Sequence, residues 1–208
     1  MSDIAGSDGP TAVVFDVGNV LFHWDLALLF DTVIADSARR EHFLGEVLTY
    51  EVHTRHDAGE DIDVLVDELL RAWPDYAEEI AAYRNRFNES IGGRVAGVHE
   101  LVLRLADKGV PLFALTNFGT FFWDGFYPTE PVFAYFADIV VSGREKLAKP
   151  DPAIYRLSQN RFGRAAGELL FIDDRADNIE AAKACGWHGH LFTDAASLER
   201  DLRDRGLL

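Results

Sequence analysis

The amino-acid sequence predicts an α/β fold, in which a parallel β-sheet is covered by helices and a helical segment is inserted after the first strand. Short, continuous apolar runs alternate with helix-like segments in the C-terminal part of the chain. Such runs are typical of strands buried on both faces of a parallel sheet. Residues 26–90, in contrast, show helical periodicity alone. Strands that alternate with helices favour a parallel sheet with helices on both of its faces.

Composition and charge narrow the possible functions. The chain has 208 residues, of which 48% are hydrophobic and 12% aromatic, so there is ample material for a core. A net charge of −15 argues against nucleic-acid and anionic-membrane partners, because both need a basic surface. It leaves room for a phosphorylated substrate, since local cations or a metal ion can offset an acidic surface.

The sequence gives no sign of a membrane or secretory segment. No apolar run approaches the ~20 residues of a membrane span. The start, MSDIAGSDGP, lacks the features of a signal peptide, so we expect a cytoplasmic protein. The single cysteine, Cys185, excludes an intrachain disulfide. We interpret it as a small buried helix residue rather than a nucleophile, because no nearby histidine is spaced to activate it.

The N-terminal half predicts one strand followed by helices. Residues 1–10 are expected to form a loose tail, and residues 12–15 (AVVF) the first strand. Four later segments space apolar residues three and four apart, as helices do: LALLFDTVIADS, REHFLGEVLTYEV, DVLVDELLRAW and DYAEEIAAYRNRF. Turn and cap residues in HDAGED and WPD separate some of these segments. We therefore expect a helical cap domain at residues 24–91, inserted into an α/β core domain of residues 11–23 and 92–208.

The rest of the chain alternates strand and helix after Gly92-Gly93. Strands are predicted at residues 112–115, 139–141, 169–172 and 190–192, and helices at 98–108, 153–162, 176–185 and from about 196. The stretch from Phe118 to Phe136 is rich in aromatic residues. They can fill the core, line a pocket or form an interface, and the pattern does not divide them among these roles.

Polar residues end three of the predicted strands. Asp16 follows the first strand, Thr116-Asn117 a second, and Asp173-Asp174 a third. Ligands of open α/β sheets bind outside the carboxyl ends of the strands, so these groups predict an active site. A carboxylate such as Asp16 can attack phosphorus or an alkyl carbon. The alternative for Asp16 is a cap or turn role. Gly18 and Asn19 permit a tight turn that exposes backbone to a ligand.

The acidic pair and a lysine suggest how an anion could be held. Mg²⁺ prefers oxygen ligands, and Asp16 could share one such ion with Asp173 or Asp174. Helix capping is the alternative, but two adjacent aspartates exceed what a cap requires. Lys149 lies ahead of a helix and could neutralise a nucleophile and a phosphate, or simply be solvated. Thr116 and Asn117 could offer a hydroxyl and an amide to anionic oxygens, or could simply form the turn at the end of the strand.

Taken together, these segments resemble the haloacid dehalogenase (HAD) superfamily over nearly the whole chain. The family places a nucleophilic Asp after strand one, Ser or Thr after strand two, Lys before a later helix and an acidic pair after strand four. The matching positions here are Asp16, Thr116, Lys149 and Asp173-Asp174. The helical insert stands where the family has its C1 cap domain. Three segments are especially similar to a bacterial branch that acts on α-glucose 1-phosphate and related esters: FDVGNVLF, KPDPAIY and FIDDRADNIEAA.

The resemblance implies a Rossmann-like core and a Mg²⁺-dependent phosphatase. Asp16 would form an aspartyl-phosphate intermediate with a small phosphorylated metabolite, such as a sugar phosphate. Asp16, the Gly18 carbonyl and Asp173 or Asp174 would hold the metal, while Lys149, Thr116 and the Asn117 backbone would hold the phosphoryl oxygens. The protein would act as a monomer or homodimer.

One departure from the family pattern concerns proton transfer. Family phosphatases carry a second Asp two residues after the nucleophile as general acid and base, and here that residue is Gly18. General acid–base catalysis contributes about 10²–10⁴-fold. His23, His53 or His56 could replace it, because a histidine titrates near neutral pH, and Arg55 could grip a substrate anion. Surface or packing roles are the alternatives for all four.

Two other functions remain as alternatives. A metal-independent 2-haloacid dehalogenase would use Asp16 to attack carbon, but Asp173-Asp174 disfavours it, because added negative charge does not help a site for a carboxylate substrate. A degenerate, non-catalytic binding protein would explain Gly18. The presence of Asp16, Lys149 and both acidic residues argues against that function.

Overall fold

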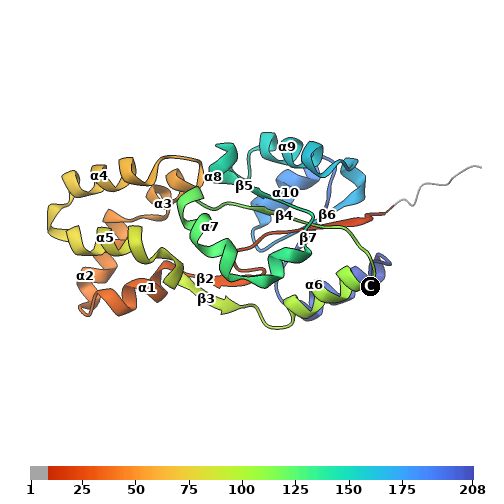
Figure 1. Ribbon diagram of the computed structural model, residues 1–208, viewed down its shortest axis with the longest axis horizontal. Coiled ribbons are helices and arrows are strands. Elements are labelled where there is room, and N and C mark those ends of the chain that lie inside the picture. Colours follow the sequence, from red (N-terminus) through yellow and green to blue (C-terminus); the bar gives the residue numbers. More distant parts are fainter. Residues whose placement is uncertain (1–8) are drawn as a thin grey trace, which may run out of the picture.

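The computed structural model describes residues 9–208 and contains one parallel five-stranded sheet (Figure 1). Its strand order is β5–β4–β1–β6–β7, with all neighbours parallel. The expected tail at residues 1–10 lies almost wholly outside the described residues. The strands are β1 (Ala12–Phe15), β4 (Leu112–Thr116), β5 (Asp138–Val141), β6 (Leu169–Asp173) and β7 (His188–Leu191). Each begins or ends within two residues of its predicted counterpart.

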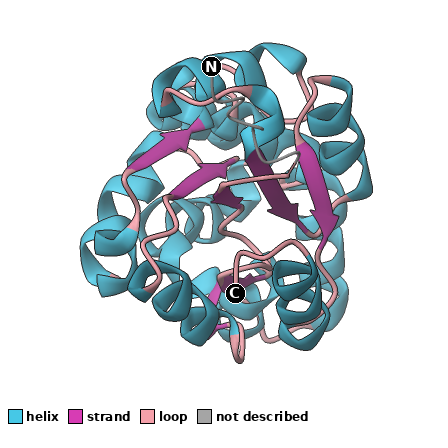
Figure 2. Cartoon of the chain, turned by 90° about the vertical axis from the view of Figure 1, so that its right-hand side faces the viewer, coloured by secondary structure: helices cyan, strands magenta, loops and turns pink. Residues whose placement is uncertain are grey.

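Helices cover both faces of this sheet (Figure 2). Because side chains alternate along a strand, Ala12 and Val14 of β1 face one core cluster, and Val13 and Phe15 face another. The first cluster is completed by α9 (Pro152–Phe162) and α10 (Ala176–Ala184), and the second by α6 (Val98–Asp107) and α11 (Ala195–Asp204). The predicted α/β fold is therefore confirmed.

Residues 26–90, which we call the helical lobe, pack beside the carboxyl edge of the sheet (Figure 1). They form α1 (Leu26–Val33), α2 (Ser37–His42), a π-helical turn (Phe43–Val47), α3 (Tyr50–Asp57), α4 (Ile62–Ala72) and α5 (Ala77–Arg86), with 3₁₀ turns at Pro74–Tyr76 and Phe87–Ser90. The periodic segment REHFLGEVLTYEV is not one helix. Thr49 caps α3 by accepting a hydrogen bond from the Val52 amide, so the chain breaks there. The division into core and cap domains stays a prediction.

A short antiparallel ribbon, absent from the predicted elements, connects the lobe to the sheet domain. It pairs β2 (Phe22–Trp24) with β3 (Ile91–Arg94), so that Phe22 faces Arg94 and Trp24 faces Ile91. The chain therefore enters and leaves the lobe through two hydrogen-bonded strands that lie side by side.

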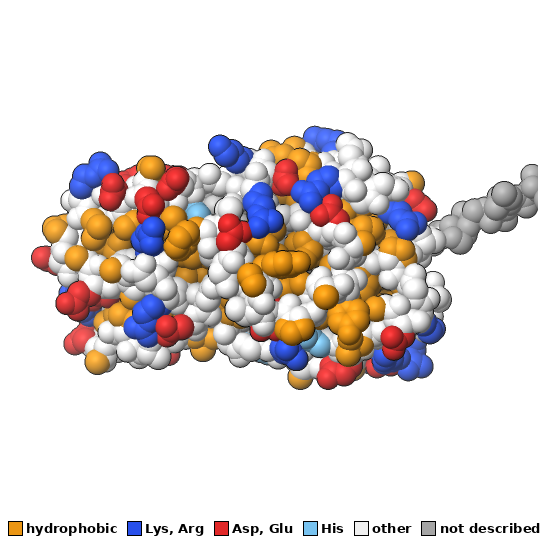
Figure 3. Space-filling view, viewed as in Figure 1, with side chains coloured by type: hydrophobic (Ala, Val, Ile, Leu, Met, Phe, Trp, Pro, Cys, Tyr) orange, Lys and Arg blue, Asp and Glu red, His pale blue; other side chains and the backbone are white. Residues whose placement is uncertain are grey.

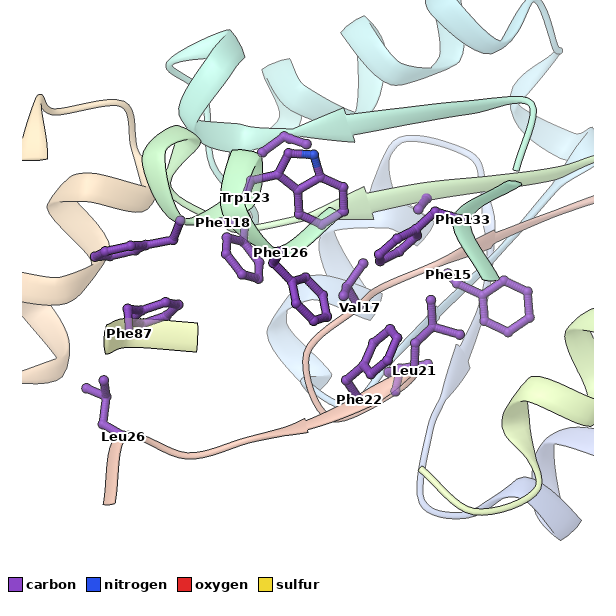
Figure 4. Close-up of a cluster of buried hydrophobic side chains, with 14 of the residues drawn as sticks. Phe15, Val17, Leu21, Phe22, Leu26, Phe87, Phe118, Trp123, Phe126 and Phe133 are labelled. Carbon is purple, nitrogen blue, oxygen red and sulfur yellow. The ribbon is translucent and has the colours of Figure 1, made fainter. Parts of the chain in front are cut away.

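The aromatic stretch after β4 joins the lobe to the sheet domain. It forms α7 (Thr120–Phe126) and 3₁₀ turns at Tyr127–Thr129 and Pro131–Tyr135, and β5 is followed by the short helix α8 (Ser142–Glu145). Phe87 of the lobe stacks on Phe122, with ring centroids 4.0 Å apart. Figure 4 shows the packed set that includes Phe118, Phe126 and Phe22.

The surface is mixed in character (Figure 3). Acidic and basic side chains are scattered over the visible face, and hydrophobic side chains are exposed between them, over the helical lobe as well as near the middle. Phe121, Tyr127 and Tyr135 of the aromatic stretch are among the exposed large hydrophobic residues. Across residues 9–208 the helices are all too short or too polar to cross a bilayer.

Candidate active site

Three buried charged groups meet at the carboxyl edge of the sheet. Asp16 directly follows β1, Asp173 ends β6, and Lys149 lies on the loop before α9. The Lys149 Nζ atom lies 2.9 Å from Asp16 Oδ2 and 2.7 Å from Asp173 Oδ2. The side chains of Lys149 and Asp173 are only 2% and 0% exposed. The structure thus brings Asp16 next to two groups that lie more than a hundred residues further along the sequence.

Lys149 is held by the loop that follows β4. The Asn117 Nδ2 group donates to the Lys149 carbonyl, and the Lys149 amide donates to Asn117 Oδ1, both at 2.9 Å. The Asn117 side chain therefore fixes the backbone of the lysine. Thr116, the last residue of β4, is buried beside this pair.

Asp173 is surrounded by donors. Besides Lys149, the Asn178 Nδ2 group lies 3.0 Å from both of its oxygens, and the Arg175 amide donates to Oδ1 at 2.8 Å. Asn178 was not among the predicted site residues. Its position in the first turn of α10, five residues after Asp173, was the available signal.

A third carboxylate completes a possible metal site. Asp16, Asp173 and Asp174 can each present an oxygen so that the three atoms lie within 4.8 Å of one another. Carboxylates are the hard oxygen ligands that Mg²⁺ takes, usually together with waters. The donor set therefore fits this cation.

The charges of the site also favour a bound cation. Burial raises the pKa of Asp16 to about 7, Lys149 opposes this and Asp173 adds to it. Burial, followed by Asp173, also raises the pKa of Asp174. Burial lowers the pKa of Lys149, but the two neighbouring carboxylates outweigh it and raise that pKa overall. The lysine stays charged, and one positive charge faces three acids.

A pocket opens over Asp16 between the sheet domain and the helical lobe. The polar lining includes Asp16, Asn19, Asp57, Asn117, Lys149, Asp174 and Arg175, and the aromatic lining includes Phe22, Trp24, Tyr50, His53, Phe87, Phe118 and Phe126. Gly18, Asn19 and His53 were predicted contacts and do line it. Asp57, Tyr50, Trp24 and Arg175 were not predicted, because only the packing of the lobe brings them here.

Three predicted substrate contacts have other surroundings. His23 is exposed on β2 and does not line the pocket. The Arg55 guanidinium donates to Glu60 and to Glu68, so its charge is already paired within the lobe. The His56 ring is buried against Gly119, and its Nδ1 atom lies 2.7 Å from the Glu60 carbonyl oxygen.

Comparison with known proteins identifies one family and several related proteins. Residues 10–186 match the family described as haloacid dehalogenase-like hydrolase. A sesquiterpene phosphatase from Aspergillus oryzae is 27% identical over 195 residues, which cover 92% of this chain and 94% of that protein. A phosphoglycolate phosphatase from Pectobacterium atrosepticum is 31% identical over 138 residues, which cover 62% of this chain and 58% of the relative.

The solved structures show the same fold. One is a HAD family enzyme from Bacteroides thetaiotaomicron, determined with magnesium and inorganic phosphate. It superposes with a TM-score of 0.72 at 19% identity, covering 89% of this chain and 96% of that one.

Proposed function

The chain belongs to the haloacid dehalogenase-like hydrolase family, as its motifs predicted, and we propose that it is a Mg²⁺-dependent phosphatase acting through an aspartyl-phosphate. The observation on which the proposal rests is the buried Asp16–Lys149–Asp173 cluster at the sheet edge, with Asp174 beside it in one pocket. The phosphatase names of two relatives support it.

Asp16 is the proposed nucleophile. Its Oδ1 atom accepts a hydrogen bond from the Val17 amide at 2.7 Å, and its Oδ2 atom faces Lys149, so the carboxylate is fixed in one orientation. Attack on phosphorus forms a bond from Asp16 to the phosphoryl group as the ester P–O bond breaks and the alcohol departs, and water then hydrolyses the bond to Asp16 and releases phosphate. Lys149 offsets negative charge at the nucleophile and on the phosphoryl oxygens. Thr116 and the Asn117 backbone are proposed to contact the same oxygens.

We further propose Asp16, the Gly18 carbonyl and Asp174 as the metal ligands. Asp173 already accepts four hydrogen bonds from Lys149, Asn178 and the Arg175 amide, which occupy its lone pairs. Asp174 lines the pocket and Asp173 does not. A bound Mg²⁺ supplies Lewis-acid stabilisation of charge on the phosphoryl group. The role of Asp173 is then to hold Lys149 in place.

The pocket supports a small phosphomonoester as substrate. Polar groups gather around Asp16, and the Trp24 and Phe87 rings form an apolar wall toward the lobe. Pockets of this kind orient a ligand by a few polar groups and bind its body on apolar surface. A ring-shaped leaving group, such as that of a sugar phosphate, suits this division. Asp173 and Asp174 disfavour the dehalogenase alternative, since they would repel a carboxylate substrate.

The test is hydrolysis of p-nitrophenyl phosphate with and without Mg²⁺, by the wild type and by Asp16→Asn. We expect release that needs both Mg²⁺ and Asp16. A matched control is Asp67→Asn, which removes the charge of an exposed aspartate on α4 and should leave activity unchanged. An inactive wild type at every Mg²⁺ concentration, or an active Asp16→Asn, contradicts the proposal. Halide release from a 2-haloacid would then favour the dehalogenase.

A further inference from the structure

We propose that Asp57, carried by the helical lobe, transfers the proton that the family's second aspartate would transfer and that Gly18 cannot. The inference rests on the proposed phosphatase function. Asp16, Asp57 and Asp174 are the carboxylates that line the pocket. Asp16 is the proposed nucleophile and Asp174 a proposed metal ligand, so Asp57 is the pocket carboxylate without an assigned task.

The backbone of Asp57 is tied to the same sheet edge as Asp16. Asp57 is the last residue of α3, and its carbonyl accepts a hydrogen bond from Ser142 Oγ at 2.5 Å. The same Oγ atom accepts from the Phe118 amide at 2.9 Å. Ser142 is completely buried where β5 ends, and Phe118 lies two residues after β4. One serine therefore fixes the end of α3 above the strand ends.

The carboxylate of Asp57 is oriented by a buried chain of polar groups. Its Oδ2 atom lies 3.5 Å from His53 Nε2, and His53 Nδ1 lies 2.8 Å from the Tyr83 hydroxyl. The His53 ring stacks between Trp24 and Phe87, with centroids 5.3 and 5.2 Å away. A hydroxyl that donates to Nδ1 leaves the ring proton on Nε2, where it faces Asp57.

His53 and Tyr83 act through Asp57 as positioning residues. His53 is only 3% exposed, and both of its ring nitrogens face protein groups. Burial lowers the pKa of His53, which Asp57 opposes, and this favours the neutral ring beside the carboxylate. His23 and His56, the other histidines considered for this task, do not line the pocket.

The proposed chemistry balances over two steps. As the bond from Asp16 to phosphorus forms and the ester P–O bond breaks, the Asp57 carboxyl proton passes to the departing oxygen. In the second step the Asp57 carboxylate takes a proton from water as water bonds to phosphorus and the bond to Asp16 breaks, which releases phosphate.

The test compares two esters that differ in leaving group and carry no extra hydroxyls. Phenol has a pKa of about 10, like the tyrosine side chain, so its departure needs a proton, whereas p-nitrophenolate leaves readily without one. For Asp57→Asn we expect kcat/KM to fall by about 10²–10⁴-fold with phenyl phosphate and by less than about 10-fold with p-nitrophenyl phosphate. Tyr83→Phe should show the same bias toward p-nitrophenyl phosphate with a smaller loss.

Comparing two substrates in one variant guards against misfolding, because a misfolded fraction lowers both rates equally. Asp67→Asn is the charge-matched control and should change neither rate. Equal losses with the two esters, or no loss in Asp57→Asn, would overturn the role of Asp57 while leaving the phosphatase intact. A wild type that hydrolyses neither ester would instead refute the proposed function.

Discussion

Replacing Lys149 with methionine tests the electrostatics of the site directly. Lys149→Met keeps an unbranched side chain of similar length but removes the charge that lies 2.9 Å from Asp16 and 2.7 Å from Asp173. Two buried carboxylates then face each other without their cation. We expect the variant to lose stability as well as activity.

The structure sets the size and pH dependence of this loss. Removing one partner of a buried ion pair costs about 3–5 kcal/mol of unfolding free energy. Asp173 keeps its bonds to Asn178 and the Arg175 amide, so we expect about 3 kcal/mol. The folded pKa of Asp16 is already raised to about 7 from 3.8, and losing Lys149, which lowers it, raises it further. A carboxyl whose pKa is higher in the folded than in the unfolded state takes up its proton at a higher pH in the folded state. The free energy of unfolding therefore increases as the pH falls through that folded pKa.

Urea unfolding followed by tryptophan fluorescence, with EDTA present, provides the measurement. The difference between wild type and Lys149→Met should be larger at about pH 8.5 than at about pH 5, since acid neutralises Asp16 in the variant. Lys108→Met, on the exposed end of α6, controls for the loss of a positive charge. Equal differences at the two pH values, or a cost no larger than that of Lys108→Met, would refute the electrostatic reasoning.

Three further changes test the packing around the site, each by urea unfolding. Gly119→Ala places a Cβ within the His56 ring and should cost about 1–3 kcal/mol, most of it recovered in the double variant with His56→Ala; simple additivity would contradict this. Tyr155→Phe removes the hydroxyl that donates to the Asn178 carbonyl at 2.9 Å and should cost about 1 kcal/mol; an unchanged midpoint would show that this bond adds nothing. Trp123→Ala empties a site only 1% exposed and should cost about 3–5 kcal/mol; a smaller value would mean that the aromatic cluster collapses into the space.

The sheet was predictable because buried parallel strands leave a plain mark in the sequence. Runs such as AVVF and LLFI are apolar throughout and are followed by polar groups, so both the strands and the residues at their ends could be located. The ribbon of β2 and β3 could not be predicted in this way. One strand has three residues, and the other contains Gly92-Gly93, a residue type depleted in strands. These two strands pair because the chain enters and leaves the helical lobe at the same place.

The sequence does not show which residues of the lobe reach the pocket. Asp57 stands in HTRHDAGED, where an aspartate before Ala-Gly is typical of a turn. Its position depends on Ser142, which is 85 residues away along the chain, and on His53 and Tyr83. Arg55 shows the reverse: its sequence position allowed either a substrate contact or a surface role, and in the structure its guanidinium is paired with Glu60 and Glu68. Such choices depend on tertiary neighbours, which periodicity does not reveal.

The paired strands at the base of the lobe bring the two ends of that lobe together. Trp24 and Ile91 are cross-strand partners, so residues 26–90 begin and end at neighbouring points in space. Antiparallel neighbours lie about 5 Å apart, a gap that a two-residue hairpin loop can close. A segment of another length inserted at this junction would therefore not interrupt β1 and β6, the strands that place Asp16 and Asp173. The insertion of residues 26–90 therefore leaves the order and pairing of the five parallel strands uninterrupted.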